Sequence, residues 1–271
     1  TIDVNAIEDV IAGAANQSGE DNRNVARMAA LLAGLPVTVA GNTVNRLCAS
    51  GLQSIMDSAR TIACGDAEIM IACGVENMSR APFVMPKSSS AFDRQAQIFD
   101  TTMGWRFINP ALSALYHPFT MGETAENVAR QWNISRHAQD EFSLESQQKY
   151  AAALAAGKWK DEIIPVSVRV GKEMFDFEED EHPRLSSLDK LAQLKPAFQK
   201  DGTVTAGNSS GINDGAAAML LASESAVKKY GLKPIGKVKA MAVAGVDPSV
   251  MGIGPVPATR KALERAGLTV A

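Results

Sequence analysis

The sequence predicts an α/β protein with a parallel sheet, and two observations support that fold class. A strand-like stretch at residues 37–47, a helical stretch at 49–64 and an apolar run at 67–75 follow one another directly. A strand, a helix and a buried strand in this order form a βαβ unit, whose strands run parallel. The small and apolar residues at 203–222 repeat the character of the first part, which indicates that the chain returns to the first domain there.

Helices flank the predicted strands in the first part of the chain. In residues 22–34 apolar side chains recur at helical spacing until Gly34. Residues 49–64 carry a broad apolar face and end before Gly65, a natural helix C-cap. The run at 67–75 is apolar except for Glu68, which is typical of a strand buried on both faces.

The middle of the chain differs from both ends. Residues 80–120 carry many aromatic and proline residues without a regular period, which favours a folded excursion over a plain loop. Ser135 is the expected N-cap and Gly157 the expected end of one of the helices that follow. The remaining expected elements are helices at 123–133, 135–157 and 188–194, strands within 163–177, a strand at 235–246, and a loop leading into a helix at 251–267.

Composition and charge exclude several classes of protein. The chain has 271 residues, 46% of them hydrophobic and 21% charged, which is an ordinary globular balance. The net charge is -3, and no Lys/Arg run suggests a nucleic-acid or polybasic membrane surface. No apolar run reaches the roughly 18 residues of a membrane span, and the first residues lack a signal-peptide pattern. We therefore expect a cytoplasmic protein with no nucleic-acid and no membrane partner.

The chain has only three cysteines, Cys48, Cys64 and Cys73, and this small, odd number argues against a disulfide framework. None forms a CxxC pair, and the three histidines are scattered, so we expect no metal site. Cys64 and Cys73, at the end of a helix and of a strand, are interpreted as packing residues.

Cys48 lies at the predicted junction between a strand and a helix. At a helix N-terminus, free N–H groups and the helix dipole stabilise a thiolate, the reactive form of cysteine. The small neighbours Ala49, Ser50 and Gly51 leave room for an acyl group, and backbone N–H groups there could stabilise an oxyanion. The alternative is a buried cysteine that packs as a small hydrophobe. Position alone leaves both open.

The residues around Cys48 resemble the acyl-enzyme signature of the thiolase family. The match runs from Val44 to Ile62 and includes Asn45, Cys48 and Gly51. Four further stretches are similar to family motifs in the same order: GVENMSRAP at 74–82, MGETAENVA at 121–129, GTVTAGNSSGINDGAAA at 202–218 and VMGIGPVPATRKAL at 250–263.

The resemblance implies a transferase with an acyl-thioester intermediate, in which Cys48 is the nucleophile. A cysteine attacks a 3-ketoacyl-CoA and releases acetyl-CoA, and the thiol of CoA then takes the acyl group. It implies no tightly bound cofactor, with coenzyme A and acetyl-CoA as substrates, and a homodimer or homotetramer as the intact protein. The implied fold is the thiolase fold, which consists of layered αβαβα half-domains with an inserted loop domain. The N-terminal domain is expected at 1–82 and 203–233, discontinuous and without its first strand, and the loop domain at 83–202. Residues 234–271 are expected to form the start of an incomplete C-terminal domain.

Six further positions match the family's CoA contacts. Met121 resembles a residue of the pantetheine pocket, and Arg184 resembles the arginine beside the adenine and phosphates, a role that suits a guanidinium. Phe198 resembles an aromatic residue near the adenine–pantetheine end. The others are Ala206 and Ser210, near the pantetheine amides, and Met251, near the acyl pocket.

Three family motifs with catalytic Asn, His and Cys follow the MGIGPVP segment in thiolases, and the sequence stops at Ala271 before any of them. We therefore expect a truncated product. Because the activating His is among the missing residues, we expect this length of chain to have little or no turnover.

The substrate is expected to be 3-oxoadipyl-CoA, an intermediate of aromatic catabolism, because DTTMGWRFINP at 100–110 and ANQSGEDNRNVARMA at 15–29 resemble that branch. A diacid needs a cation near the acyl pocket, and Arg46, Arg80 or Arg106 could supply it. The alternatives are an acetyl-CoA acetyltransferase or a 3-ketoacyl-CoA thiolase of fatty acid metabolism, a ketosynthase acting on carrier-protein thioesters, and a non-catalytic fragment that binds CoA or a partner chain.

Overall fold

The structure is a computed structural model that describes residues 2–270, and it divides into two compact units. The first unit comprises Thr1–Asn109, Ile212–Ala244 and Pro255–Ala271, and the second comprises Pro110–Gly211 and Gly245–Gly254. No helix among the described residues has the length and apolar character needed to cross a membrane. The predicted three-domain boundaries stay a prediction.

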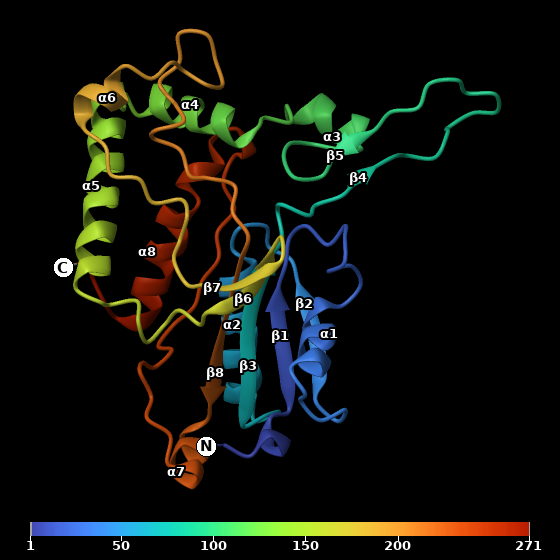
Figure 1. Cartoon of the computed structure of the whole chain (residues 1–271), viewed down its shortest axis with the longest axis vertical. Helices are drawn as coiled ribbons and strands as arrows, with labels where there is room; N and C mark the ends of the chain where they lie inside the picture. Colours follow the sequence, from blue (N-terminus) through green and yellow to red (C-terminus); the bar gives the residue numbers. More distant parts are fainter. Residues whose placement is uncertain (1, 271) are drawn as a thin grey trace. The chain divides into compact units, whose positions relative to one another are not determined.

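A four-stranded sheet is the centre of the first unit (Figure 1). Its strands are β1 (Asp9–Gly13), β2 (Ala40–Val44), β3 (Ile69–Glu76) and β8 (Gly215–Ala222), in the order β2-β1-β3-β8. β1 runs parallel to both β2 and β3, which confirms the predicted parallel sheet, whereas β8 is antiparallel to β3. The pairing of β8 with β3 also confirms that the chain returns to the first sheet.

Two strand predictions differ from the structure. β1, between β2 and β3, was not predicted, because DVIAG is short and follows an irregular stretch. Residues 235–246 were predicted as a strand but have no strand structure. Apolar composition alone does not make a strand, because the backbone also needs a neighbouring strand to pair with; Ile235 and Val238 are exposed there.

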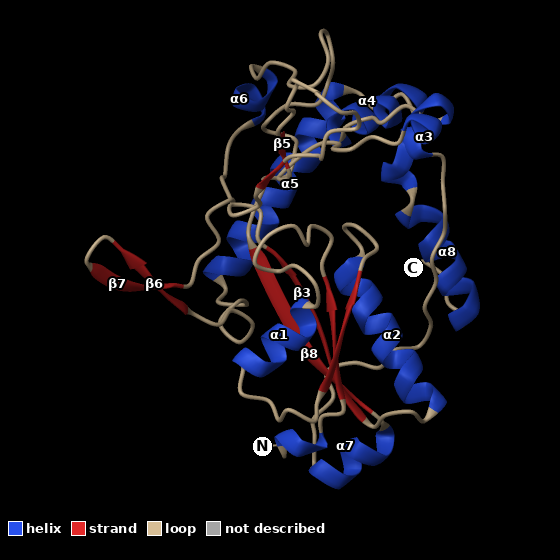
Figure 2. Ribbon diagram, turned by 90° about the vertical axis from the view of Figure 1, so that its right-hand side faces the viewer, coloured by secondary structure: helices blue, strands red, loops and turns tan. Residues whose placement is uncertain are grey.

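Helices α1 (Val25–Leu32) and α2 (Ser50–Cys64) confirm the two helices predicted beside the sheet. They cover opposite faces of it (Figure 2). On the α1 face, Val10 and Ala12 of β1 pack with Ala26 of α1. On the α2 face, Ile11 packs with Met70 of β3 and Ile62 of α2. Successive residues of β1 therefore serve the two cores alternately, as strand geometry requires.

Short elements complete the first unit. They are the 3₁₀-helix η1 (Val4–Ala6) and the two-residue strands β4 (Phe83–Val84) and β5 (Phe99–Asp100). The α-helices α7 (Glu224–Tyr230) and α8 (Pro255–Ala266) follow later in the chain. Residues 80–109 are largely irregular, as predicted, but residues 85–98 contain no helix or strand and are exposed throughout, so the predicted folded excursion is wrong for that stretch. The helix predicted within 251–267 is present as α8.

The second unit is mainly helical. Its elements are α3 (Pro110–Leu115), α4 (Met121–Gln131), α5 (Arg136–Ala155), the hairpin β6 (Val166–Val170) and β7 (Glu173–Phe177), α6 (Leu188–Ala192) and η2 (Pro248–Ile253). Thr120 and Glu123 form a capping box that starts α4 two residues before the predicted start. Ser135 caps α5 as predicted, and Gly157 follows its end with a φ of 66°.

Candidate active site

The N-terminus of α2 lies directly against the carboxyl ends of β1 and β3. A side-chain carbon added to Gly13 would lie 2.2 Å from the backbone carbon of Ser50, and one added to Gly74 would lie 3.3 Å from the Cα of Gly51. Ser54 of α2 donates from Oγ to the carbonyl of Cys73 at 2.9 Å. Only glycines allow this close approach, which places the start of α2 at the sheet edge where α/β proteins bind ligands.

Cys48 lies in the turn between β2 and α2, two residues before the first residue of α2, which confirms its predicted position at a junction between a strand and a helix. The turn is closed by hydrogen bonds from the Ala49 N–H to the Arg46 carbonyl at 3.1 Å and from the Ser50 N–H to the Leu47 carbonyl at 3.0 Å. Ser50 Oγ accepts from the Arg46 N–H and donates to the Leu47 carbonyl. Cys48 is exposed, so a substrate can reach it at a position just before the N-terminus of a helix.

A side-chain network joins this turn to the ends of the two neighbouring strands. Asn45 Nδ2 donates to the Ala15 carbonyl at 3.1 Å, and Asn45 Oδ1 accepts from the Leu47 N–H at 2.9 Å. The carboxylate of Glu76, the last residue of β3, accepts from the N–H groups of Ala15 and Asn16. The loop after β1 is therefore held between the end of β3 and the turn that carries Cys48.

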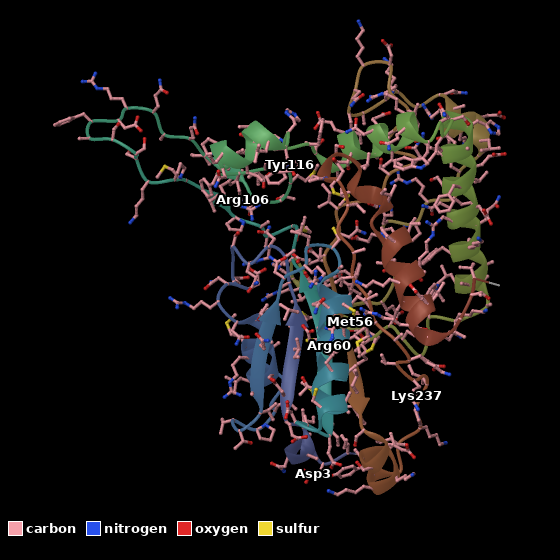
Figure 3. The ribbon with its side chains drawn as sticks, turned by 180° about the vertical axis from the view of Figure 1, so that it is seen from behind. Asp3, Met56, Arg60, Arg106, Tyr116 and Lys237 are labelled. Atoms are coloured by element: carbon pink, nitrogen blue, oxygen red, sulfur yellow. The ribbon has the colours of Figure 1, made fainter. Side chains whose placement is uncertain are left out.

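The three arginines proposed as substrate cations have different surroundings. Arg80 forms an exposed ion pair with Glu20 at 2.8 Å. Arg46 donates to Gln53 Oε1 at 2.7 Å, so its side chain runs along α2. Arg106 donates to Asn16 Oδ1 at 3.1 Å, beyond the end of the sheet in Figure 3.

The other two cysteines differ from each other. Cys73 is partly buried and packs against the core on the α1 face, in agreement with the prediction, and burial raises the pKa of its thiol. Cys64 is exposed, so its interpretation as a packing residue was wrong. Its helix position was predicted correctly, but the last turn of α2 presents its side chain to solvent. Within residues 2–270 no group of three or more His, Cys, Asp or Glu side chains is placed to hold a metal ion.

The second unit contains all six predicted CoA contacts, and a buried carboxylate organises the loop that carries two of them. Glu126 of α4 is 4% exposed and accepts from the N–H groups of Thr203 at 2.7 Å and Val204 at 2.8 Å. Asn208 accepts from the Thr205 N–H at 2.7 Å and donates to Asp140 at 3.0 Å. This polar cluster fixes the loop at 203–209.

The structure brings some of the six residues to the same helix. Met121 is the first residue of α4, and the ring of Phe198 lies so close to Gly122 that an added side-chain carbon would be 2.1 Å from it. Met251 lies in η2, which packs on α4, where Asn127 donates to the Ser249 carbonyl at 3.0 Å.

The remaining three predicted contacts are exposed, as Met121 and Phe198 are. Ala206 and Ser210 lie within and just after the loop held by Glu126. Arg184 is beside α5, where its N–H donates to Gln147 at 2.8 Å. An open groove of about 340 Å³ beside α4 is lined by residues outside the predicted set, among them Phe119, Asn127, Arg130 and Val250.

Sequence reasoning gave no role to Glu76 or Asn45, although both lie in motifs that it identified. Their partners are far away in the sequence: 61 residues separate Glu76 from Ala15, and 30 separate Asn45 from Ala15. One signal was available for Glu76, since a carboxylate at the carboxyl end of a buried parallel strand is at the expected ligand edge.

Comparison with known proteins gives consistent results. Residues 1–225 match the family model "Thiolase, N-terminal domain", and residues 232–271 match "Thiolase, C-terminal domain". The chain is 54% identical to the 3-oxoadipyl-CoA/3-oxo-5,6-dehydrosuberyl-CoA thiolase of Escherichia coli, with 99% of this chain and 68% of that protein aligned. It is 55% identical to the beta-ketoadipyl-CoA thiolase of Pseudomonas aeruginosa, with 99% of this chain and 67% of that protein aligned.

A solved structure shares the fold. The crystal structure of the Bacillus anthracis acetyl-CoA acetyltransferase superposes with a TM-score of 0.90 at 40% identity, and covers 99% of this chain and 67% of that one. The chain is also 49% identical to the acetyl-CoA acetyltransferase of Chromobacterium violaceum, with 97% of this chain and 67% of that protein aligned. None of these matches bears on the expected lack of turnover, which stays a prediction.

Proposed function

The chain belongs to the thiolase family of acyltransferases, and we propose that Cys48 is its nucleophile and 3-oxoadipyl-CoA its substrate. The observation that supports the nucleophile is the exposed Cys48 sulfur in a fixed turn at the N-terminus of α2. The substrate is proposed because the E. coli and P. aeruginosa relatives carry this activity in their names.

In the first step the Cys48 thiolate attacks the 3-keto carbon of the substrate. The bond between C2 and C3 breaks, C2 takes up a proton, and acetyl-CoA leaves while a succinyl group remains on the sulfur as a thioester. In the second step the sulfur of CoA attacks this thioester, and succinyl-CoA leaves with Cys48 restored. N–H groups at the start of α2 are the nearest candidates to stabilise the negative oxygen that forms in each step.

The terminal carboxylate of a 3-oxoadipyl group requires a positive charge, and Arg106 is the best placed of the three candidates. Arg80 is already paired with a carboxylate, and Arg46 points along α2. Arg106 forms no ion pair with any described residue, and its partner Asn16 belongs to the network that adjoins the Cys48 turn. Arginine binds carboxylates through two parallel hydrogen bonds, which suits this role.

The six residues of the second unit are proposed as CoA contacts, with no tightly bound cofactor. The fixed loop at 203–209, which contains Ala206 and is followed directly by Ser210, supports this assignment, because a preorganised loop loses little entropy when a ligand binds. We also propose a cytoplasmic homodimer or homotetramer. An acetyl-CoA acetyltransferase is the second candidate, on the names of the C. violaceum and B. anthracis proteins, and a thiolase of fatty acid metabolism is the third.

Two measurements test these proposals. After incubation with acetyl-CoA or 3-oxoadipyl-CoA, peptide mass spectrometry should find the acyl group on Cys48, and the Cys48→Ala variant should carry none. An acyl group on Cys64 alone would refute Cys48 as the nucleophile. No adduct at all would favour a non-catalytic CoA-binding protein. Because little or no turnover is expected of this length of chain, the second measurement is the rate at which Cys48 takes up an acyl group. Arg106→Gln should reduce this rate for 3-oxoadipyl-CoA at least about tenfold, the value of one charged hydrogen bond, and spare acetoacetyl-CoA. The matched control is Arg80→Gln, and equal losses on both substrates would exclude Arg106 as the carboxylate contact.

A further inference from the structure

The turn that carries Cys48 contains an unfavourable backbone conformation. Leu47, the residue before Cys48, has a φ of 49°. This left-handed region costs a residue with a Cβ roughly 1–2 kcal/mol. The Leu47 side chain is 66% exposed, so packing of that side chain against a core does not offset the cost. Hydrogen bonds to the backbone of the turn must supply the restraint.

Asn45 supplies two such restraints, one through the oxygen and one through the nitrogen of its side-chain amide. Its Oδ1 accepts from the Leu47 N–H at 2.9 Å, which fixes the peptide unit before Leu47. Its Nδ2 donates to the Ala15 carbonyl at 3.1 Å, which fixes the orientation of the amide itself. The conformation at Leu47 therefore depends on where the Ala15 carbonyl points.

Glu76 determines the orientation of the Ala15 backbone. Its carboxylate accepts from the N–H groups of both Ala15 and Asn16. Hydrogen bonds to an ionised acceptor are stronger than those between neutral groups. Glu76 is the last residue of β3, whose residue Gly74 also lies against the start of α2 at Gly51, so the carboxylate is tied to the same framework as the helix.

We propose that Glu76 and Asn45 are positioning residues for Cys48, linked by hydrogen bonds in the order Glu76, Ala15, Asn45, Leu47. Neither side chain is assigned a contact with substrate. They hold the turn so that Cys48, the residue after Leu47, keeps its position just before the first residue of α2. The inference deepens the proposed role of Cys48 and rests on it for its catalytic meaning.

The test compares two cysteines in one molecule. Cys48 and Cys64 are both exposed, so iodoacetamide reaches both, and peptide mass spectrometry gives the rate at each. Loss of the restraint should lower the Cys48 rate relative to the Cys64 rate by about tenfold in Glu76→Ala and Asn45→Ala, because small displacements of a reactive group have effects of at least this order. A variant that merely loosened the fold would bring both rates toward the value for an unfolded chain.

Conservative variants and a matched control sharpen the test. Glu76→Gln keeps an oxygen acceptor and should retain most of the rate ratio. Asn45→Asp keeps the acceptor for Leu47 but loses the donor to Ala15, so it should behave as Asn45→Ala. Glu20→Gln changes an exposed carboxylate paired with Arg80 and should leave the ratio unchanged.

The outcomes separate the two proposals. If Asn45→Ala, at an exposed position, keeps the wild-type ratio within about twofold, the positioning role is wrong even if Glu76→Ala fails to fold. If the wild-type chain takes an acyl group from acetyl-CoA at Cys48 while the ratio is insensitive to Asn45 and Glu76, the nucleophile assignment stands and the positioning role falls. If the ratio depends on both residues but no acyl group ever forms on Cys48, the positioning role stands and the proposed function falls.

Discussion

Two loops of this chain are fixed in the same way but lie in different surroundings. In the first unit Glu76 accepts from the N–H groups of Ala15 and Asn16. In the second unit Glu126 accepts from the N–H groups of Thr203 and Val204. A carboxylate that receives two successive backbone N–H groups replaces the water those groups would otherwise bind.

Burial distinguishes the two arrangements. Glu126 is buried and also accepts from the Thr203 hydroxyl at 2.9 Å, so all its bonds stay within one loop. Glu76 is partly buried, and its effect continues through Ala15 and Asn45 to the turn of Cys48. The comparison predicts that Glu126 matters more for stability and Glu76 more for the reactivity of Cys48.

The largest effect on the first region is expected from Gly13→Ala. The new methyl group would lie within 2.4 Å of the backbone of Ser50 and Gly51, so α2 must shift away from β1. We expect a loss of about 3 kcal/mol in the free energy of unfolding, the upper range for overpacking, measured by urea denaturation. Gly236→Ala is the control, since an added carbon there meets nothing within 4 Å. Equal stability of Gly13→Ala and wild type would show that α2 does not rest on β1 as described.

Glu126→Ala should have the next largest effect. It leaves the buried N–H group of Val204 and the partly buried N–H group of Thr203 without their acceptor, which should cost about 2 kcal/mol of unfolding free energy, while Glu126→Gln should recover part of it. The relative alkylation rate of Cys48 should not change. A variant of full stability, or one that lowered the Cys48 rate as strongly as Glu76→Ala, would contradict the contrast between the two loops.

The smallest effect concerns a third carboxylate at the same sheet edge. Hydrogen bonds from the side chain and backbone of Ser79 lower the pKa of Asp214. A carboxyl whose pKa is lowered by folding stabilises the fold above its unfolded pKa of about 3.9 and loses this contribution as the pH falls through the folded value. Ser79→Ala should therefore be less stable at pH 7 by about 0.5 kcal/mol, a small value because Asp214 is exposed.

The pH dependence is the check on that assignment. Unfolding midpoints of Ser79→Ala and wild type should converge as the pH falls from above the unfolded pKa of Asp214 through its lowered folded pKa. A difference that persists unchanged over this range would have to come from packing of the Ser79 side chain and not from the charge of Asp214.

The sequence was sufficient for features that depend on neighbouring residues. The apolar face of residues 49–64 and the glycine after it predicted α2 and its end at Gly65, which has a φ of 80°. Ser135 likewise marked the start of α5. Motifs led to the proposal of Cys48 as the nucleophile for the same reason, because the residues that match the family signature around it are contiguous.

Features that depend on distant partners could not be predicted. β1 has only five residues, and pairing with both β2 and β3 supports it. Residues 235–246 have a similar apolar composition but no strand beside them. The role proposed for Glu76 depends on Ala15, which only the folded sheet brings close.

The close packing of the start of α2 against Gly13 and Gly74 also affects the order in which the chain folds. Contacts between residues that are distant in the sequence form only after the intervening chain has closed into loops. The turn of Cys48 is therefore completed late, once β1, α2 and β3 have come together. Pulses of alkylating reagent at successive times of refolding would then measure, from the reactivity of Cys48, when the sheet assembles. Cys64, the last residue of α2, gives the reactivity of an exposed cysteine outside that turn.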